Sequence, residues 1–552
     1  MDKRWIGGAA LMAMGVALGA GWAAQGGQAA SPAPLPPVTR GAPAPGTAPG
    51  EACARLSGRI GGMEITRATL ITPAPNWAPQ SDSTYVPVPV TRPLCRVEGA
   101  IEGNIGVEAW LPLDWNGRLL AGGVGGPAGQ FNYRDMSRRA QEGFATFSTD
   151  SGHKKAFERW MSLPKARVDY EHRATHLSTL AVKAVAEAFY GRAPGKAYFL
   201  GCSGGGRQGL KEMQQYPGDY DGIIAGAPGP DMPRQSVRML WFALQAKRSP
   251  AGALNDADWD LYEKTAVSQC DGLDGVKDGV IAYPPACRVD ISRLACAPGG
   301  AAGNGGGTCL SAPKLAMLRQ IISPMPDEHG RPMDRGLFAG VRTRPGPPSP
   351  LLRQMWADGV YDNPDWNEDT FRRTHDLNAA YRLMPQLAAN STAIGPFVAR
   401  GAKAIIYQGW ADPSTNAGPT LDYYDALTRA RGGRAALGQS VRLFMVPGMY
   451  HCRGGAGPDA FGGSGHETWP GNPQRDMLWA LIDWVEQGRA PDTIIATGQR
   501  KAGVGAGAYT RPICAYPMRA EYAGRGGDIW DAASYRCAMP KARSSPWAKG
   551  GA

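Results

Sequence analysis

One twelve-residue stretch, F-L-G-C-S-G-G-G-R-Q-G-L at 199–210, constrains the fold more than any other part of the sequence. The apolar residues Ala197–Leu200 predict a buried strand, and Arg207–Gln215 have the pattern of a helix. Between them lies Gly201-Cys202-Ser203-Gly204-Gly205, a G-x-S-x-G turn whose glycines allow tight backbone angles and close backbone approach. Ser203 is therefore a candidate nucleophile above the end of a strand.

Short apolar segments alternate with helical ones on both sides of this turn. Strands are expected at 118–122, 143–150, 222–227, 403–408 and 441–446, and helices over 170–190 and 476–487. This alternation predicts an α/β fold with a parallel sheet covered by helices on both faces. It stops between about Asp231 and Val398. We therefore expect an α/β-hydrolase core in two parts, 51–230 and 399–552, with a large inserted lid domain at 231–398.

The N-terminus has the pattern of an export signal. Lys3 and Arg4 precede the apolar stretch Trp5–Ala24, and small residues follow. This pattern predicts a bacterial signal peptide at 1–30, followed by a disordered Pro/Ala-rich leader at 31–50. An uncleaved membrane anchor is the alternative. Because no later apolar run is long enough to span a bilayer, we expect a secreted or periplasmic protein without a stable membrane anchor after cleavage.

The chain is basic, with a formal net charge of +11. Its Lys and Arg residues are scattered, and no basic run is interleaved with aromatic residues. This distribution argues against nucleic-acid binding and favours a solvated basic surface. A secondary interpretation is attraction of substrates that carry a carboxylate.

Two residues complete a catalytic triad in the order that an α/β-hydrolase requires, serine, then acid, then histidine. Asp412 follows the strand expected at 403–408, in Y-Q-G-W-A-D-P-S, and His451 follows the strand at 441–446, in P-G-M-Y-H-C. Asp150 also follows a strand but precedes Ser203, so it ranks below Asp412. The alternatives are a turn or helix-capping role for Asp412 and a structural role for His451.

The chemistry of each residue type assigns the roles. Ser203 would attack the acyl carbon, and His451 would take the serine proton and pass it to the leaving alcohol. Asp412 would hold the imidazole in the correct tautomer. Ester hydrolysis through an acyl-enzyme needs these three groups and no metal.

The oxyanion hole needs two backbone N–H donors. One is the N–H of Gly204, which follows the nucleophile. The second is expected from the glycine loop G-V-G-G-P-A-G at 123–129, with Gly126 favoured and Gly125 as the next candidate.

Ten cysteines in an exported chain predict disulfides, although sequence alone does not give the pairing. Spacing favours four local pairs, Cys53–Cys95, Cys270–Cys287, Cys296–Cys309 and Cys514–Cys537. Cys202 and Cys452 remain, and they adjoin Ser203 and His451, which must touch. A Cys202–Cys452 disulfide is therefore geometrically feasible, and two free buried thiols are the alternative.

The segments G-C-S-G-G-G-R-Q-G, G-W-A-D-P-S and H-C, with the loop G-V-G-G-P-A-G, resemble the tannase and feruloyl esterase family, which includes bacterial mono(2-hydroxyethyl) terephthalate hydrolase. The resemblance extends over about Cys53–Cys537, and the ten cysteines fall where the five disulfides of the family would place them. It implies an α/β-hydrolase core with an inserted lid, and esters of aromatic acids as substrates.

The resemblance also implies a structural calcium ion in the lid, at C-D-G-L-D-G-V-K-D-G-V-I from Cys270. Asp271, Asp274 and Asp278 offer the hard oxygen ligands that calcium prefers, at a spacing that is not that of an EF-hand. By resemblance, the backbone carbonyls of Val276 and Val280 complete the set. An ordinary acidic turn is the alternative.

These observations predict a secreted serine carboxylesterase for small aromatic esters, either feruloyl and other cinnamoyl esters or galloyl esters. Alternatives are hydrolysis of mono(2-hydroxyethyl) terephthalate or other aromatic half-esters, peptide hydrolysis, and a non-enzymatic binding module. Several residues of the lid are candidates either for the substrate pocket or for core and surface, namely Trp356, Tyr361, Trp366, Phe371, Arg353 and Arg372.

Overall fold

The computed structural model describes residues 47–72, 77–297, 308–343, 350–500, 507–524 and 526–540. The expected signal peptide at 1–30 and all but the last four residues of the leader at 31–50 lie outside this range. Both therefore stay predictions. In the part of the chain that is described, no helix is long and apolar enough to cross a membrane.

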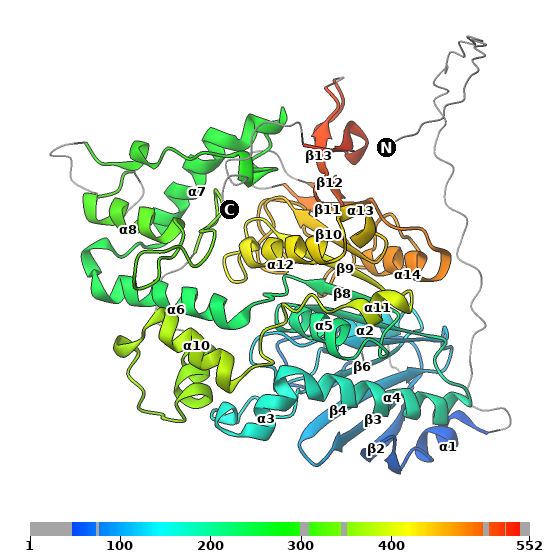
Figure 1. Cartoon of the computed structure of the whole chain (residues 1–552). Coiled ribbons are helices and arrows are strands. Elements are labelled where there is room, and N and C mark those ends of the chain that lie inside the picture. Colours follow the sequence, from blue (N-terminus) through cyan, green and yellow to red (C-terminus); the bar gives the residue numbers. More distant parts are fainter. Residues whose placement is uncertain are drawn as a thin grey trace, which may run out of the picture. The chain divides into compact units, whose positions relative to one another are not determined.

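One large sheet organises the described chain, with the strand order β1-β2-β3-β4-β6-β5-β7-β8-β9-β10 (Figure 1). Its parallel part consists of β6 (Ala145–Thr149), β5 (Arg118–Gly122), β7 (Lys196–Cys202), β8 (Gly222–Gly226), β9 (Lys403–Gly409) and β10 (Val441–Val446). Parallel strands end at one edge of a sheet, so the loops after these strands meet there. Three of those loops carry the predicted triad.

The N-terminal part of the sheet is antiparallel, so the predicted parallel sheet is one part of a mixed sheet. Strands β1 (Gly58–Ile60), β2 (Met63–Ile71), β3 (Leu94–Ile101) and β4 (Ile105–Pro112) pair antiparallel, as do β4 and β6. A parallel crossover needs a dozen or more residues. Only Glu102–Asn104 join β3 to β4, with φ of 52° at Glu102 and 76° at Gly103, so this connection is a hairpin.

Helices cover both faces of the sheet, as the alternation predicts. Successive residues of β7 point to opposite faces: Phe199 joins the hydrophobic cluster that contains α4 (Ala174–Tyr190) and α5 (Gly204–Gln215). Tyr198 instead reaches α14 (Met477–Gln487), where its Oη donates to Glu486 Oε1 at 2.7 Å. Asp476 caps α14 by accepting the N–H of Leu478.

The stretch 231–398 contributes no strand to the large sheet among its described residues. It forms α6 (Met232–Arg248), α7 (Asp256–Cys270), α8 (Ala312–Ile322), α9 (Pro350–Gln354), α10 (Arg373–Leu383) and α11 (Gly395–Ala399), most of them gathered beside the sheet (Figure 1). Most of the buried apolar side chains of α6, α8 and α10 join a second hydrophobic cluster, which also contains Val124, Trp160 and Tyr170 from the first part of the chain. The assignment of 231–398 as a separate lid domain stays a prediction.

The C-terminal region adds two antiparallel pairs that the sequence pattern did not predict. They are β11 (Thr493–Gln499) with β12 (Ala508–Cys514), and β13 (Arg519–Tyr522) with β14 (Tyr535–Ala538). The Cys514–Cys537 disulfide connects the two pairs.

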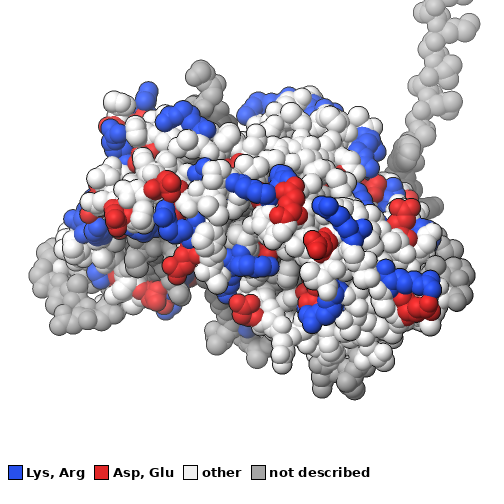
Figure 2. Space-filling model, turned by 90° about the horizontal axis from the view of Figure 1, so that it is seen from below, with Lys and Arg blue, Asp and Glu red and all other residues white. Residues whose placement is uncertain are grey.

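Charged side chains of both signs are interspersed on the face shown in Figure 2. Lys and Arg there lie beside Asp and Glu and do not form a continuous basic patch. Nucleic-acid binding would require such a patch or stripe. This face therefore offers no footprint for nucleic acid.

Candidate active site

The turn between β7 and α5 holds Ser203 in a strained conformation, with φ 63° and ψ −126°. Positive φ is rare for a residue with a side chain and is typical of functional sites. The glycines that follow it are needed because neighbouring backbone segments pack directly against them. A Cβ on Gly205 would lie 2.8 Å from the backbone of Gly123, and a Cβ on Gly206 would lie 2.2 Å from the carbonyl oxygen of Gly226. The G-x-S-x-G sequence therefore folds into the elbow that it predicts.

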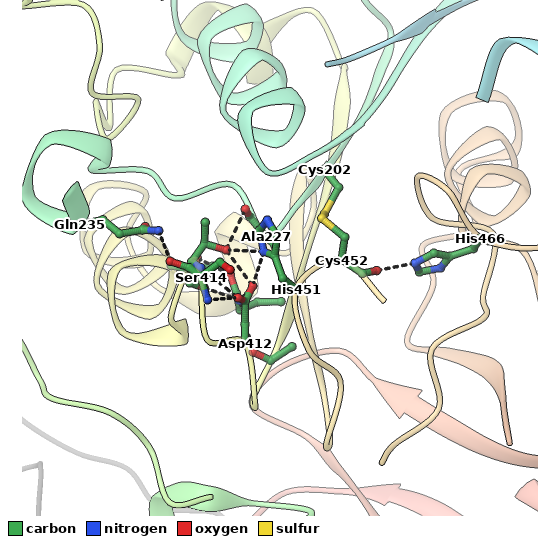
Figure 3. Close-up of polar contacts among 12 residues, drawn as sticks. Cys202, Ala227, Gln235, Asp412, Ser414, His451, Cys452 and His466 are labelled. Atoms are coloured by element: carbon green, nitrogen blue, oxygen red, sulfur yellow. Dashed lines mark hydrogen bonds and ion pairs between the residues drawn. A yellow bond between two sulfur atoms is a disulfide. The ribbon is translucent and has the colours of Figure 1, made fainter. Parts of the chain in front are cut away.

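Asp412 and His451 come together at the same edge of the sheet (Figure 3). His451 Nδ1 donates to Asp412 Oδ2 at 2.8 Å. Asp412 is fully buried, and its Oδ1 accepts the backbone N–H groups of Ser414 (2.8 Å) and Thr415 (2.9 Å). The carboxylate is thus held by its own loop and orients the imidazole.

Two further side chains hold this carboxylate, and the sequence reasoning missed both. Thr415 Oγ1 donates to Asp412 Oδ2 at 2.8 Å and lies 3.2 Å from His451 Nδ1. Gln408 Nε2 donates to the same oxygen at 3.1 Å. A hydroxyl three residues after an Asp is a local signal of a turn in which both groups bond to the backbone. That signal pointed to Thr415, but nothing in the sequence singled out Gln408.

The environment of His451 favours its protonated form. Burial by itself lowers the pKa of the imidazole, but the charge of Asp412 and its hydrogen bond outweigh burial and raise the pKa of His451 above its ordinary value. An imidazolium is therefore stabilised here, as a general base requires once it has accepted a proton.

The glycine loop after β5 offers one backbone N–H to the site. Gly125 is excluded as a donor because its N–H already donates to Tyr85 Oη at 2.6 Å. Gly126 has φ 60°, and its carbonyl accepts from Tyr170 Oη at 2.9 Å. Among the described residues no acceptor takes the N–H of Gly126, and Gly204 is the first residue of α5, where N–H groups lack helical partners. Gly126 and Gly204 thus remain the candidate donor pair.

The Cys202–Cys452 disulfide joins the residue before Ser203 to the residue after His451, with Cα atoms 6.0 Å apart (Figure 3). His466 Nε2 donates to the carbonyl of Cys452 at 2.6 Å. Burial lowers the pKa of His466 to about 4, so this ring is neutral at pH 7. The other four disulfides are Cys53–Cys95, Cys270–Cys287, Cys296–Cys309 and Cys514–Cys537, the pairs that spacing favoured.

A cavity of about 180 Å³ opens at Ser203 and His451 and also contacts Gly126 and Gly204. Its apolar wall comes mainly from the inserted stretch, through Met232, Met239, Leu351 and Leu352. The aromatic candidates of the lid do not line it. Trp356, Trp366 and Phe371 are buried in the second hydrophobic cluster, and Tyr361 stacks on Trp366.

The arginine candidates also lie outside this cavity. Arg353 Nη2 donates to the carbonyls of Pro364 (3.0 Å) and Trp366 (3.1 Å). Its guanidinium therefore links α9 to residues 364–366 within the inserted stretch.

The predicted calcium loop follows α7, and the Cys270–Cys287 disulfide fastens it. Asp271 accepts the N–H groups of Asp278 (3.2 Å) and Gly279 (3.0 Å), and Asp274 accepts that of Val276 (3.1 Å). Burial, together with the charge of Asp278, raises the pKa of Asp274 to about 6. The three carboxylates thus belong to one loop that their own hydrogen bonds to the backbone hold, and calcium stays a prediction.

A serine on a strained strand-to-helix turn, with an Asp–His pair and free N–H donors at the same sheet edge, defines a hydrolase of the α/β-hydrolase fold. The family model for "Tannase and feruloyl esterase" matches residues 88–368 and 355–538. The chain belongs to the tannase and feruloyl esterase family, and it is a carboxylic ester hydrolase.

The relatives agree over most of their length. A probable feruloyl esterase B from Emericella nidulans is 31% identical over 506 residues, which cover 88% of this chain and 94% of that protein. The crystal structure of feruloyl esterase B from Aspergillus oryzae matches with a TM-score of 0.81 and 28% identity, over 89% of this chain and 100% of that one. The tannin acyl hydrolase from Aspergillus niger shares the fold, with a TM-score of 0.70. It is 22% identical, and the match covers 89% of this chain and 95% of that one.

Proposed function

We propose that this protein is an exported serine carboxylesterase that hydrolyses esters of aromatic acids through an acyl-enzyme. The observation that carries the proposal is the shared cavity of Ser203 and His451, with His451 bonded to the buried Asp412 at 2.8 Å. The names of the relatives point to the same chemistry, since several are called feruloyl esterase B.

The reaction has two halves. His451 removes the proton of Ser203 Oγ as that oxygen attacks the ester carbonyl, and the N–H groups of Gly126 and Gly204 bind the developing oxyanion. His451 then gives the proton to the leaving alcohol, which departs and leaves the acyl group on Ser203. Water, deprotonated by His451, releases the acid and restores the serine. Asp412 stays ionised throughout and stabilises the imidazolium.

The cavity favours an uncharged aromatic acyl group over a half-ester with a second carboxylate. Among its described lining residues, Arg207 is the only Lys, Arg, Asp or Glu. Its Nη1 and Nη2 already donate to the carbonyls of Glu171 (2.8 Å) and Tyr170 (2.9 Å). A free carboxylate would meet only the Nε of Arg207, which has no hydrogen-bond partner among the described residues, and would lack the bidentate pairing that best offsets its burial. Cinnamoyl esters therefore fit better than mono(2-hydroxyethyl) terephthalate.

Ser203→Ala tests the mechanism, and a panel of esters tests the substrate. We expect the variant to lose turnover of methyl ferulate and labelling by a fluorophosphonate while keeping its circular dichroism spectrum. We expect the wild-type protein to prefer methyl ferulate to mono(2-hydroxyethyl) terephthalate, with methyl gallate and a peptide substrate as further arms. Wild-type turnover by Ser203→Ala would contradict the mechanism, and preference for the terephthalate half-ester would contradict the substrate.

Calcium fits the acidic loop as a structural ion. Asp271, Asp274 and Asp278 supply three carboxylates, of which Asp278 is paired with Arg511 Nη2 at 2.5 Å. The remaining charge of about −2 matches a divalent cation. Among the described residues no donor reaches the carbonyl oxygens of Val276 or Val280, so both are free to bind an ion.

Export is supported by the five disulfides, because such bonds persist in oxidising compartments. We propose secretion or delivery to the periplasm after removal of residues 1–30. N-terminal sequencing of the protein recovered outside the cytoplasm would test this, and an N-terminus that still begins at Met1 would contradict it.

A further inference from the structure

A second cluster of ligand-forming side chains lies between α4 and α5 (both labelled in Figure 1), apart from the catalytic cavity. His176 is on α4, Glu212 is near the end of α5, and Asp219 is in the loop before β8. One ligand atom from each lies within 4.8 Å of the others. Within the described part of the chain, no other group of three or more His, Cys, Asp or Glu side chains meets this spacing.

Glu212 is buried without a donor. Glu212 is 1% exposed, and no hydrogen-bond donor of the described chain reaches either of its carboxylate oxygens. A carboxylate oxygen of Asp219 lies within 4.8 Å of one of these oxygens. Lys183 lies close by, but its Nζ donates to the backbone carbonyl of Asp219 at 2.5 Å. Two carboxylates in contact need a proton or a metal ion between them.

We propose that His176, Glu212 and Asp219 bind a divalent transition-metal cation of the zinc class. An imidazole nitrogen with two carboxylate oxygens is a ligand set that Zn²⁺ takes, whereas Ca²⁺ prefers oxygen alone. His176 Nδ1 and Asp219 Oδ2 form a hydrogen bond of 2.7 Å, which the ion would replace by binding between the two atoms.

The position of the imidazole suits a ligand. Its ring stacks on Tyr216 at 3.8 Å between centroids with 6° between the planes, so its orientation is held. The side chain of His176 is 24% exposed, whereas that of Asp219 is 6% exposed. The ion would therefore enter on the His176 side, and the two carboxylates would match its charge.

The consequence is structural. The ion would join α5, whose N-cap is Ser203, to α4 and to the loop before β8. Glu212 follows Ser203 by nine residues, about 14 Å along a helix, so the ion would not touch the reacting atoms. We therefore expect it to stabilise the catalytic helix and to leave the chemistry unchanged.

The test measures zinc retention and thermal stability with calcium held in excess, so that the acidic loop after α7 does not contribute. After incubation with Zn²⁺ and gel filtration, the wild-type protein should retain a single equivalent of zinc by elemental analysis. Its Tm should rise by about 2–3 °C at a hundredfold excess over Kd. Glu212→Gln keeps the shape and removes a ligand, so both effects should disappear. Glu187→Gln, at an exposed carboxylate on the same α4, is the matched control and should behave as wild type.

Two results would overturn the proposal. A wild-type protein that retains no zinc and shows no rise in Tm would leave a shared proton as the link between the carboxyl groups. Equal retention by Glu212→Gln would place the zinc elsewhere. His176→Gln, at a partly exposed position, is the second variant and decides the question if Glu212→Gln fails to give a native circular dichroism spectrum.

Discussion

Removing the Cys202–Cys452 disulfide should cost stability and turnover together. The bond closes a loop with a sequence separation of 250, for which the chain-entropy model gives about 5.5 kcal/mol of unfolding free energy. The loss of turnover has a separate cause, because the bond holds the neighbours of Ser203 and His451. A shift of about 1 Å in a catalytic group costs about a hundredfold in rate. We expect kcat of Cys202→Ala/Cys452→Ala on methyl ferulate to fall about 10–100-fold.

The matched control is Cys53→Ala/Cys95→Ala. That pair is also buried but lies far from the site, and its separation of 42 gives about 4 kcal/mol in the same model. Urea unfolding followed by tryptophan fluorescence measures the stability of both variants, and steady-state kinetics measures kcat. The control should lose stability and keep kcat within about twofold of wild type. If the Cys202/Cys452 variant kept the same kcat as the control, the bond would stabilise the fold without positioning the triad, and our reasoning would be refuted.

Three further predictions concern pH and calcium. Because Asp412 raises the pKa of His451, kcat/KM should fall on the acid side with an inflection above the ordinary histidine value of about 6.5. Asp412→Asn should move that inflection to lower pH and reduce kcat by about 10⁴. An unmoved inflection would contradict the assignment of Asp412. Burial lowers the pKa of His153 and of His466 to about 4, so the unfolded state binds more protons than the folded state between about pH 6.5 and 4. The free energy of unfolding should therefore fall as the pH falls through this window, by up to about 3 kcal/mol per ring. Urea unfolding at pH 7 and pH 5 checks this, and His466→Gln should show a shallower dependence than wild type. Chelation by EGTA should lower the Tm, and Asp274→Asn should remove that sensitivity; an unchanged Tm would count against calcium.

The parallel part of the sheet could be predicted from the sequence because each strand there is a short, mostly apolar run. The run at 441–446 matches β10, and 403–408 differs from β9 by one residue. The antiparallel part was missed because β2 and β3 alternate burial irregularly and are separated by a long proline-rich connection. Their pairing depends on contacts across the sheet, which no local pattern encodes.

The meeting of Ser203, Asp412 and His451 at one sheet edge could be predicted because all three follow strand ends in a fixed order; their catalytic roles stay a prediction. Asp150 shows why that order mattered. It also follows a strand, but its Oδ1 accepts the N–H groups of Gly106 and Gly152 at 2.9 Å, and its Oδ2 pairs with Lys154 at 2.7 Å. Position at a strand end alone did not separate this structural carboxylate from the proposed catalytic carboxylate of Asp412.

The choice between Gly125 and Gly126 marks the limit of such reasoning. Both lie in the same glycine loop, and the local sequence favours Gly126 but does not exclude Gly125. Tyr85, 40 residues earlier, decides between them by accepting the N–H of Gly125 at 2.6 Å. Tyr170, 44 residues later, bonds the carbonyl of Gly126 and so holds the next peptide in place. The donor is thus selected by side chains from two distant segments, and only the folded chain brings those segments to the loop. The same holds for the acyl pocket, whose methionines and leucines come from α6 and α9, whereas the aromatic residues that looked suited to it are buried in the core of the inserted stretch.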